Sequence, residues 1–357
     1  MRWLCTFIIL LLSLQLPFQA EGKRKIGKIR KVVRGFSAID TSYIEPQHYN
    51  YTVMLQSTFN YDFYRLASTS GHSVDLSPDV IMKVGPYVGW RWFFFGYTFE
   101  LQNIGVEDGK LKKEFDFSIY SSQIGVDLFY RRTGSDYKIR DVQLGEEIDR
   151  SLLEGIPFNG VNVGITGINA YYIFNHNRFS YPAAFAQSTC QKISCGSWIA
   201  GIGYTRNSLE FDSQKLETIV KDKCQIESFE VDSGLKFNKV NYYDLSFSGG
   251  YAYNWVFARN CLFCASAQLA VAYKRSHGNT EGTGSNGFEF DNINLDGIGR
   301  FGLVYNNTRW YAGVSAILHT NNYSKARFET YNIFGSLNLY VGYNFGLKSR
   351  YRKKKTT

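Results

Sequence analysis

The sequence lacks any long apolar run after its first twenty residues. The densest later run is WFFFGY at 92–97, which is six residues long, whereas a membrane helix needs about 18 consecutive, mostly apolar residues. Proline is scarce as well, with 6 residues in 357, as expected where strands dominate, because proline cannot donate a ladder hydrogen bond. These two shortages exclude a helical membrane protein and favour a chain built of β-strands.

Candidate catalytic histidines are few. The five histidines are His48, His72, His176, His277 and His319. A serine or cysteine nucleophile needs a base within hydrogen-bond reach and a third group that orients this base. No histidine of this chain lies in a recognisable motif of that kind, so we predict no catalytic residue and a non-enzymatic protein.

Cysteine marks no site either. After residue 20 the cysteines are Cys190, Cys195, Cys224, Cys261 and Cys264. Cys261 and Cys264 would face opposite sides of a strand, so their C-x-x-C spacing makes no redox or metal pair there. A Cys190–Cys195 disulfide stays open in an oxidising compartment, although pairing cannot be deduced from sequence. The Asp, His and Cys residues show no ligand spacing, so we predict no metal and no cofactor.

The first twenty residues have the pattern of a secretory signal. Arg2 precedes the apolar run from Trp3 to Leu14, and a polar break with Pro17 and Ala20 follows. Such a segment is too short for a permanent membrane span and is removed on export. We therefore expect residues 1–20 to be a signal peptide and the remaining chain to act outside the cytoplasm.

The basic charge is confined to two tails. Residues 21–34 carry seven basic groups and one acidic group, and residues 348–357 carry six basic groups and no acidic one. We predict a basic lead-in at 21–47 and a basic tail at 348–357, both periplasmic. Two interpretations stay open: solvated tails, or contact with anionic headgroups or an anionic cell-wall polymer. Nucleic acid is not an expected partner of an exported chain.

Residues 49–63, YNYTVMLQSTFNYDF, show the pattern that dominates the chain. Apolar and aromatic residues stand at the odd positions and polar residues at the even ones, which is the signature of a strand with two unlike faces. The same alternation predicts about twelve strands, at 49–64, 78–89, 92–103, 114–131 (with a bulge), 136–143, 158–174, 193–206, 240–255, 261–275, 288–305, 308–321 and 329–346.

The connections between these segments alternate in length. Short links fall at 89–91, 132–135, 256–260 and 306–307, and long polar links at 65–77, 104–113, 144–157, 207–239, 276–287 and 322–328. Outer-membrane barrels have short periplasmic turns and longer extracellular loops. Only the link at 175–192 is long where a short turn is expected. Trp90, Trp255 and Trp310 fall beside the short turns, where an aromatic girdle belongs.

A soluble β-sandwich would also alternate, but with shorter strands and charged residues on its outer face. Here the polar face is mostly Asn, Ser, Thr, Gly and Gln. The pattern therefore favours strands whose apolar face meets lipid and whose polar face meets a lumen.

Three phrases resemble a known family. IDTSYIEPQHYNYTVMLQ (39–56), GVDLFYRRTGSDYKIR (125–140) and RFSYPAAFAQS (178–188) are similar to a family of exported outer-membrane β-barrels from Bacteroidetes, described as domain of unknown function 4421. The resemblance covers about residues 36–347 and implies a barrel in the outer membrane. It implies no substrate, activity or catalytic residue.

The polar phase of the strands gives the candidate lumen-lining residues. They are Asp62, Lys83, Glu100, Asp116, Asp127, Asp244, Asp296 and Arg300. One interpretation is that these charges pair and fill a closed barrel. The other is an acidic, water-filled lumen that favours cations or a polar ligand. RFSYPAAFAQS is either a plug in the barrel mouth or a cap on the rim.

The sequence thus predicts an all-β fold, an antiparallel transmembrane β-barrel of about 12 strands (range 10–14) over residues 48–347, in contact with outer-membrane lipid. A pore or small-solute channel is the expected function. A structural or surface-interaction barrel that acts through its extracellular loops, and a lipid-modifying enzyme, are the alternatives. The sequence names no solute and leaves the oligomeric state open.

Overall fold

The computed structural model describes residues 39–90, 93–96, 99–100, 113–133, 136–280, 288–325 and 328–352. The expected signal peptide, most of the basic lead-in and half of the basic tail lie outside these residues. Within the described part of the chain, no helix is long and apolar enough to cross a membrane.

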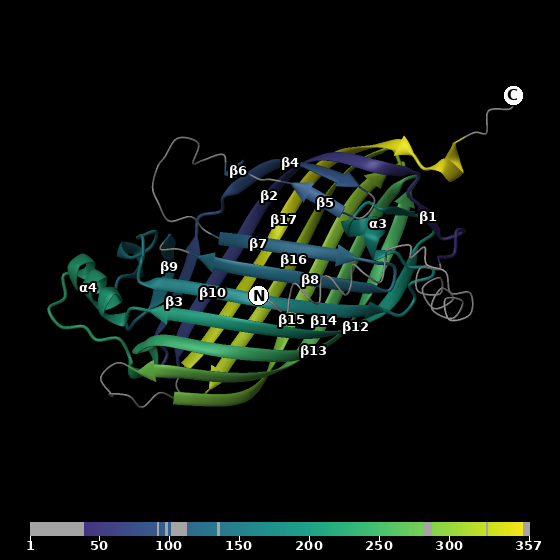
Figure 1. Ribbon diagram of the computed structural model, residues 1–357. Helices are drawn as coiled ribbons and strands as arrows, with labels where there is room; N and C mark the ends of the chain where they lie inside the picture. Colours follow the sequence, from purple (N-terminus) through teal and green to yellow (C-terminus); the bar gives the residue numbers. More distant parts are fainter. Residues whose placement is uncertain are drawn as a thin grey trace, which may run out of the picture. The chain divides into compact units, whose positions relative to one another are not determined.

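One antiparallel sheet forms the wall of the fold (Figure 1). Its path of hydrogen-bonded neighbours runs through twelve strands, in the order β5-β4-β2-β17-β16-β15-β14-β13-β12-β10-β8-β7. These strands are β2 (Tyr49–Ser68), β4 (Met82–Trp90), β5 (Phe93–Gly96), β7 (Lys113–Tyr120), β8 (Ile124–Thr133), β10 (Val161–Ile173), β12 (Cys195–Phe211), β13 (Phe237–Ala258), β14 (Cys261–Thr280), β15 (Phe288–Asn306), β16 (Trp310–Lys325) and β17 (Phe328–Leu347). The short β6 (Phe99–Glu100) also pairs with β4.

The first and last wall strands are neighbours. β2 pairs with β17 from Tyr49↔Leu347 to Ser68↔Phe328, which is the contact that turns a meander of strands into a barrel. No register joins β5 or β6 to β7 among the described residues. The predicted all-β, antiparallel barrel architecture is confirmed, and the sheet is not closed over the described residues.

The sequence prediction of a single bulged strand at 114–131 is wrong. β7 and β8 occupy this stretch as two strands, with a tight turn between them. Ser121 makes this turn: its hydroxyl accepts a hydrogen bond from the backbone N–H of Ile124 at 2.9 Å and donates to the carbonyl of Ile124 at 2.8 Å. The change of phase at residues 119–120 therefore marks a reversal of the chain.

Three predicted connections are also wrong. β8 continues to Thr133, so 132–135 is not a turn between two wall strands. β16 and β17 extend to Lys325 and from Phe328, through most of the predicted long link 322–328. The predicted strand at 136–143 exists as β9 (Tyr137–Gln143), but it pairs with β3 (Ser73–Pro78) rather than with a wall neighbour. β3 itself lies in the predicted link 65–77.

The wall has an apolar outer face and a polar inner face. In β2 the outward Tyr51, Val53 and Leu55 are 45%, 41% and 52% exposed, whereas the inward Thr52 is 7% exposed. The same alternation of outward apolar and inward residues runs along β12 to β17, with the outward residues at even numbers in β12 and β16. Such a continuous exposed apolar surface is far larger than soluble monomers carry.

We call the end of the wall that holds Tyr49 and Leu347 the proximal end. The turns at 121–123, 259–260 and 307–309 lie at this end because successive wall strands run in opposite directions. Figure 1 shows α3 (Tyr181–Phe185) and β1 (Ile44–Pro46) near this end, and α4 (Ser213–Cys224) at the opposite, distal end.

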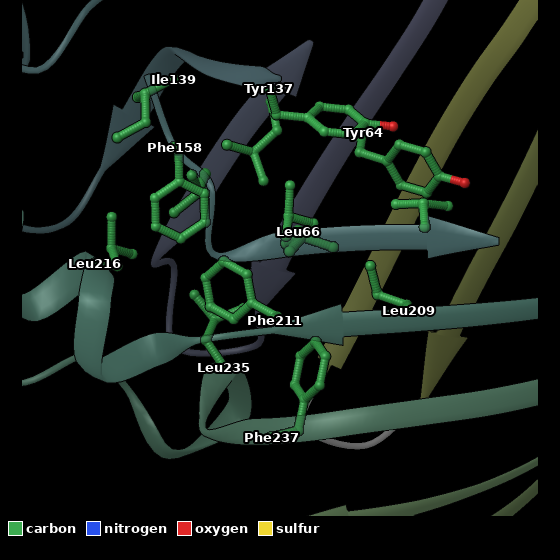
Figure 2. Close-up of a cluster of buried hydrophobic side chains, with 14 of the residues drawn as sticks. Tyr64, Leu66, Tyr137, Ile139, Phe158, Leu209, Phe211, Leu216, Leu235 and Phe237 are labelled. Carbon is green, nitrogen blue, oxygen red and sulfur yellow. The ribbon is translucent and has the colours of Figure 1, made fainter. Parts of the chain in front are cut away.

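A hydrophobic core fills the distal end (Figure 2). We call it the distal core. Its side chains come from wall strands, from β3, β9 and α4, and from the connections between strands, and include Leu66, Val74, Ile139, Phe158, Phe211, Leu216, Leu235 and Phe237. Each is buried, as in the core of a soluble domain. The segments that connect the wall strands at the distal end therefore pack together, and we call them the distal cap.

Candidate functional site

Residues 178–191, which we call the plug segment, fold inward at the proximal end. They include α3 and β11 (Thr189–Gln191). The hydroxyl of Ser180 caps α3 by accepting a hydrogen bond from the backbone N–H of Ala183, and Pro182 stands in the first turn, where its missing N–H costs nothing. Tyr181, Pro182, Ala183 and Ala184 are all buried, so this segment is inside the wall rather than on its rim.

Hydrogen bonds join the plug segment to several wall strands. The Tyr181 hydroxyl donates to Ser266 of β14 at 2.6 Å. The Gln187 amide donates to the Tyr340 hydroxyl of β17 at 2.6 Å. The Asn254 amide of β13 donates to the carbonyl of Ser180 at 2.9 Å. These contacts reach different parts of the wall, so the plug segment crosses the proximal mouth.

Small residues let the plug segment lie close to the wall. A Cβ atom on Gly302 of β15 would lie 3.4 Å from the Ala184 carbonyl oxygen and 3.5 Å from the Ala184 Cβ. On the opposite side, the rings of Tyr181 and Phe185 pack against Tyr120 of β7, with centroids 6.2 and 6.0 Å apart.

The end of the lead-in holds the plug segment in place. β1 pairs with β11 through the register Ile44↔Gln191 and Pro46↔Thr189. Gln191 is buried, and its side-chain oxygen accepts from the Ser180 backbone N–H at 2.9 Å and from Asn254 at 3.1 Å. The residues just before the first wall strand therefore help the plug segment to close the proximal mouth.

An ion pair crosses the interior beyond the plug segment. Arg300 of β15 donates from Nη2 to the Asp127 carboxylate of β8 at 2.5 Å. Strands β14, β13, β12 and β10 lie between these two along the sheet. Arg300 is 0% exposed, and its guanidinium carbon lies 4.8 Å from the centroid of the Tyr171 ring. The Ser118 hydroxyl donates to the other Asp127 oxygen at 2.7 Å.

A second charged cluster forms around a residue that sequence reasoning missed. Lys274 of β14 is 0% exposed, and its ammonium group lies 3.0 Å from Asp296 and 3.6 Å from Asp244. It also donates to the Asn321 side chain and, at 2.8 Å, to the carbonyl of Asn322. The outward apolar residues of β14 stand at odd numbers, so a residue at an even number, such as Lys274, is expected to face inward. This pattern is the sequence signal that could have identified it.

The other candidate lumen residues lie apart from these two clusters. Asp62 accepts from the Tyr137 hydroxyl at 2.7 Å, near the distal core. Lys83 lies 3.6 Å from Glu100. The Asp116 side chain is outside the described residues. Arg300 therefore joins Asp127, Lys274 joins Asp244 and Asp296, and the interior charges described here have partners of opposite sign or hydrogen-bond donors.

A small cavity lies beside the second cluster. Its volume is about 50 Å³, and its lining includes Asn169, Asp244, Asp296, His319 and Phe334. A buried water needs about 10–15 Å³ measured in this way, so the cavity has room for a few water molecules and not for a larger solute.

The histidines and cysteines form no reactive pair in the described residues. His319 stacks on Phe334 with centroids 5.0 Å apart, His176 contacts Gln123 at 2.8 Å, and His48 lies 3.1 Å from Glu45. His72 stacks on Phe229, and the His277 side chain lies outside the described residues. The five described cysteines are free thiols, so the Cys190–Cys195 disulfide that the sequence left open is not formed. No group of three His, Cys, Asp or Glu side chains here could hold a metal ion.

The fold resembles solved structures only distantly. The outer membrane protease OmpT from Escherichia coli is 10% identical, with 85% of this chain and 98% of that chain covered and a TM-score of 0.33. The translocator domain of autotransporter NalP from Neisseria meningitidis is 10% identical, with coverages of 90% and 94% and a TM-score of 0.30. The P. putida toluene transporter TodX is 7% identical, with coverages of 84% and 91% and a TM-score of 0.21.

Sequence comparison gives a family. No curated protein sequence matches the chain. The family model described as domain of unknown function (DUF4421) matches residues 38–345, which include the plug segment and every wall strand apart from the last two residues of β17. The chain therefore belongs to the DUF4421 family.

Proposed function

We propose that the chain is an outer-membrane β-barrel that is closed to solutes at rest and acts through its distal cap. The Arg300–Asp127 ion pair is the observation that carries this proposal, because it joins two distant parts of the wall across the interior. The plug segment on one side of it and the distal core on the other are packed and buried. A porin needs a continuous water-filled lumen, and the ion pair, the plug segment and the distal core would interrupt it.

The outer face of the wall supports the membrane placement. Its exposed apolar side chains on β12 to β17 include Ile202, Phe247, Leu269, Leu295, Leu318 and Val341. Trp198, Trp255 and Trp310 are exposed near the proximal end, where amphipathic rings mark a membrane interface. Together with the expected export signal, this supports an orientation with the proximal end in the periplasm and the distal cap outside the cell.

The chemistry of the interior supports a non-enzymatic role. The buried carboxylate of Asp127 pairs with Arg300, and those of Asp244 and Asp296 share Lys274. His319 packs between the aromatic rings of Phe129 and Phe334. Groups held in this way stiffen the barrel and present no activated nucleophile.

Conductance across a planar lipid bilayer tests the proposal. We expect purified, inserted protein to show no steady conductance at moderate voltage, with insertion verified by quenching of tryptophan fluorescence by brominated lipid. A steady open-channel current from the wild-type protein would overturn the closed-barrel proposal.

A channel with a displaceable plug is the second candidate. The small cavity beside Asp244 and Asp296 favours it, because it leaves space inside the wall that water can occupy. Replacing Gln187 and Asn254 by alanine removes three hydrogen bonds between the plug segment and the wall. Current that appears only in this variant would favour the gated channel over the permanently closed barrel.

A further inference from the structure

Two hairpin turns at the proximal end each place an arginine beside outward aromatic residues. Arg309 ends the turn before β16 and directly precedes Trp310. Arg259 lies in the turn after β13, beyond Trp255 and Phe257. All five side chains are exposed or lie on the outer face of the wall.

Arg309 is held against the outer surface in a defined position. Its Nε and Nη2 atoms donate to the Tyr343 hydroxyl at 3.1 and 2.7 Å. Its guanidinium carbon lies 5.4 Å from the centroid of the Tyr343 ring, and this ring packs on Trp310 at 4.5 Å. A phenol is neutral, so the arginine is positioned without losing its net charge.

Neither arginine has an ion-pair partner in the described part of the chain. At this end, the residues just before β2 include the acids Asp40 and Glu45, which lie 3.7 Å from Arg178 and 3.1 Å from His48 respectively. The turn at 121–123 and the link at 174–194 contain no acidic residue. The distal connections instead carry exposed acids, including Glu146, Glu147, Asp149 and Glu154.

We propose that Arg259 and Arg309 bind the phosphates of anionic phospholipid headgroups in the leaflet at the proximal end. A guanidinium donates two parallel hydrogen bonds to a phosphate. The adjoining tryptophans and phenylalanine require an apolar neighbour, which the acyl chains of the same lipid supply and free phosphate does not. Each arginine near an anionic surface favours the charged lipid by about fivefold. This inference rests on the membrane placement proposed above.

Tryptophan quenching by brominated lipids tests the site. The full chain is reconstituted in phosphatidylcholine vesicles that contain phosphatidylglycerol, with one lipid or the other brominated in each sample. The ratio of quenching gives the relative binding of the two lipids. We expect the wild-type protein to prefer phosphatidylglycerol, and Arg259→Gln with Arg309→Gln to lose this preference by about fivefold at each turn. Arg309→Lys should retain most of it, because the charge is kept.

Matched controls separate the possible results. Arg150→Gln with Lys223→Gln removes the same charge from exposed distal positions and should leave the preference unchanged. Millimolar inorganic phosphate should not compete, and 1 M salt should weaken the preference through screening. A wild-type protein without lipid preference, or a preference that survives in the Arg259/Arg309 variant, would overturn the assignment. Absence of quenching by brominated phosphatidylcholine would instead overturn the membrane placement itself.

Discussion

The Arg300 guanidinium lies 2.5 Å from the Asp127 carboxylate although 173 residues separate them in the sequence. Both are buried, and they belong to strands on distant parts of the wall. A buried ion pair contributes little net stability compared with apolar residues, but loss of one partner leaves an uncompensated charge. The pair therefore fixes the position of β8 relative to β15 across the interior, and it adds little to the free energy of unfolding.

The first prediction concerns this pair. Arg300→Met or Asp127→Leu alone should lower the free energy of unfolding by about 3–5 kcal/mol, because each leaves a buried charge without its partner. The double variant should recover most of this loss. Urea unfolding in lipid vesicles, followed by tryptophan fluorescence, measures all three.

An exposed pair gives the control. Lys239 and Glu210 lie 2.7 Å apart with both side chains substantially exposed, so Lys239→Gln should cost less than about 1 kcal/mol. Additive losses in the Arg300/Asp127 double variant would contradict the coupling that the geometry implies.

The second prediction concerns the fit of the plug segment. Gly302→Leu should push Ala184 away from β15, because even a Cβ at this position would already touch it. Limited trypsin digestion measures the result: we expect faster cleavage after Arg178, the first residue of the plug segment, and after Lys192, which directly follows it. Gly249→Leu is the matched control, since an added Cβ there meets nothing within 4 Å. Equal digestion rates for the two variants would mean that the plug segment does not depend on this contact.

The third prediction concerns Cys190 of β11. Burial, together with the nearby Glu45 carboxylate, raises the pKa of its thiol to about 12. Because only the thiolate reacts with alkylating reagents, labelling at pH 8 should be roughly three orders of magnitude slower in the folded protein than in urea. Mass spectrometry of the peptide that contains Cys190 measures this rate after timed exposure to iodoacetamide. Rapid labelling of the folded protein would show that β1 and β11 separate readily.

The outer and inner faces of the wall could be predicted because alternation is a local property. The parity of Asp127 and Arg300 indicates that both point inward, yet it does not indicate that they meet. Partner choice depends on the stagger of strands that are distant in sequence, which periodicity does not report. Parity could also have placed Lys274 inside the wall, but not the partners that it contacts there.

The distal core could not be predicted for a different reason. Phe158, Leu216 and Leu235 lie in connections or short helices, where no apolar period marks them as buried. β3 has 6 residues and β9 has 7, both shorter than β12 to β17, and β3 is buried at every position. The pairing of β9 with β3 keeps β9 out of the wall path. A pattern predicts that a strand exists, whereas its partner is decided by tertiary packing.

The last prediction concerns acid sensitivity of the distal cap. Asp79 follows β3, and hydrogen bonds from Lys138 and then from Arg140 lower the pKa of its carboxyl group. A lowered pKa in the folded state means that the ionised carboxylate stabilises the fold above the ordinary pKa of aspartate, near 4. This stabilisation is lost as the pH falls through the folded-state value. Since these side chains are partly exposed, the effect should stay below about 1 kcal/mol.

Asp79→Asn tests this relation between charge and pH. Above pH 5 the variant should protect the backbone amides of β3 and β9 from hydrogen exchange slightly less than the wild type does. The difference should disappear as the pH falls below 4, because the wild-type carboxyl group then becomes neutral as well. Hydrogen exchange with mass spectrometry at several pH values measures it, after correction for the intrinsic exchange rate. A difference that persists at low pH would assign the effect to packing instead of charge.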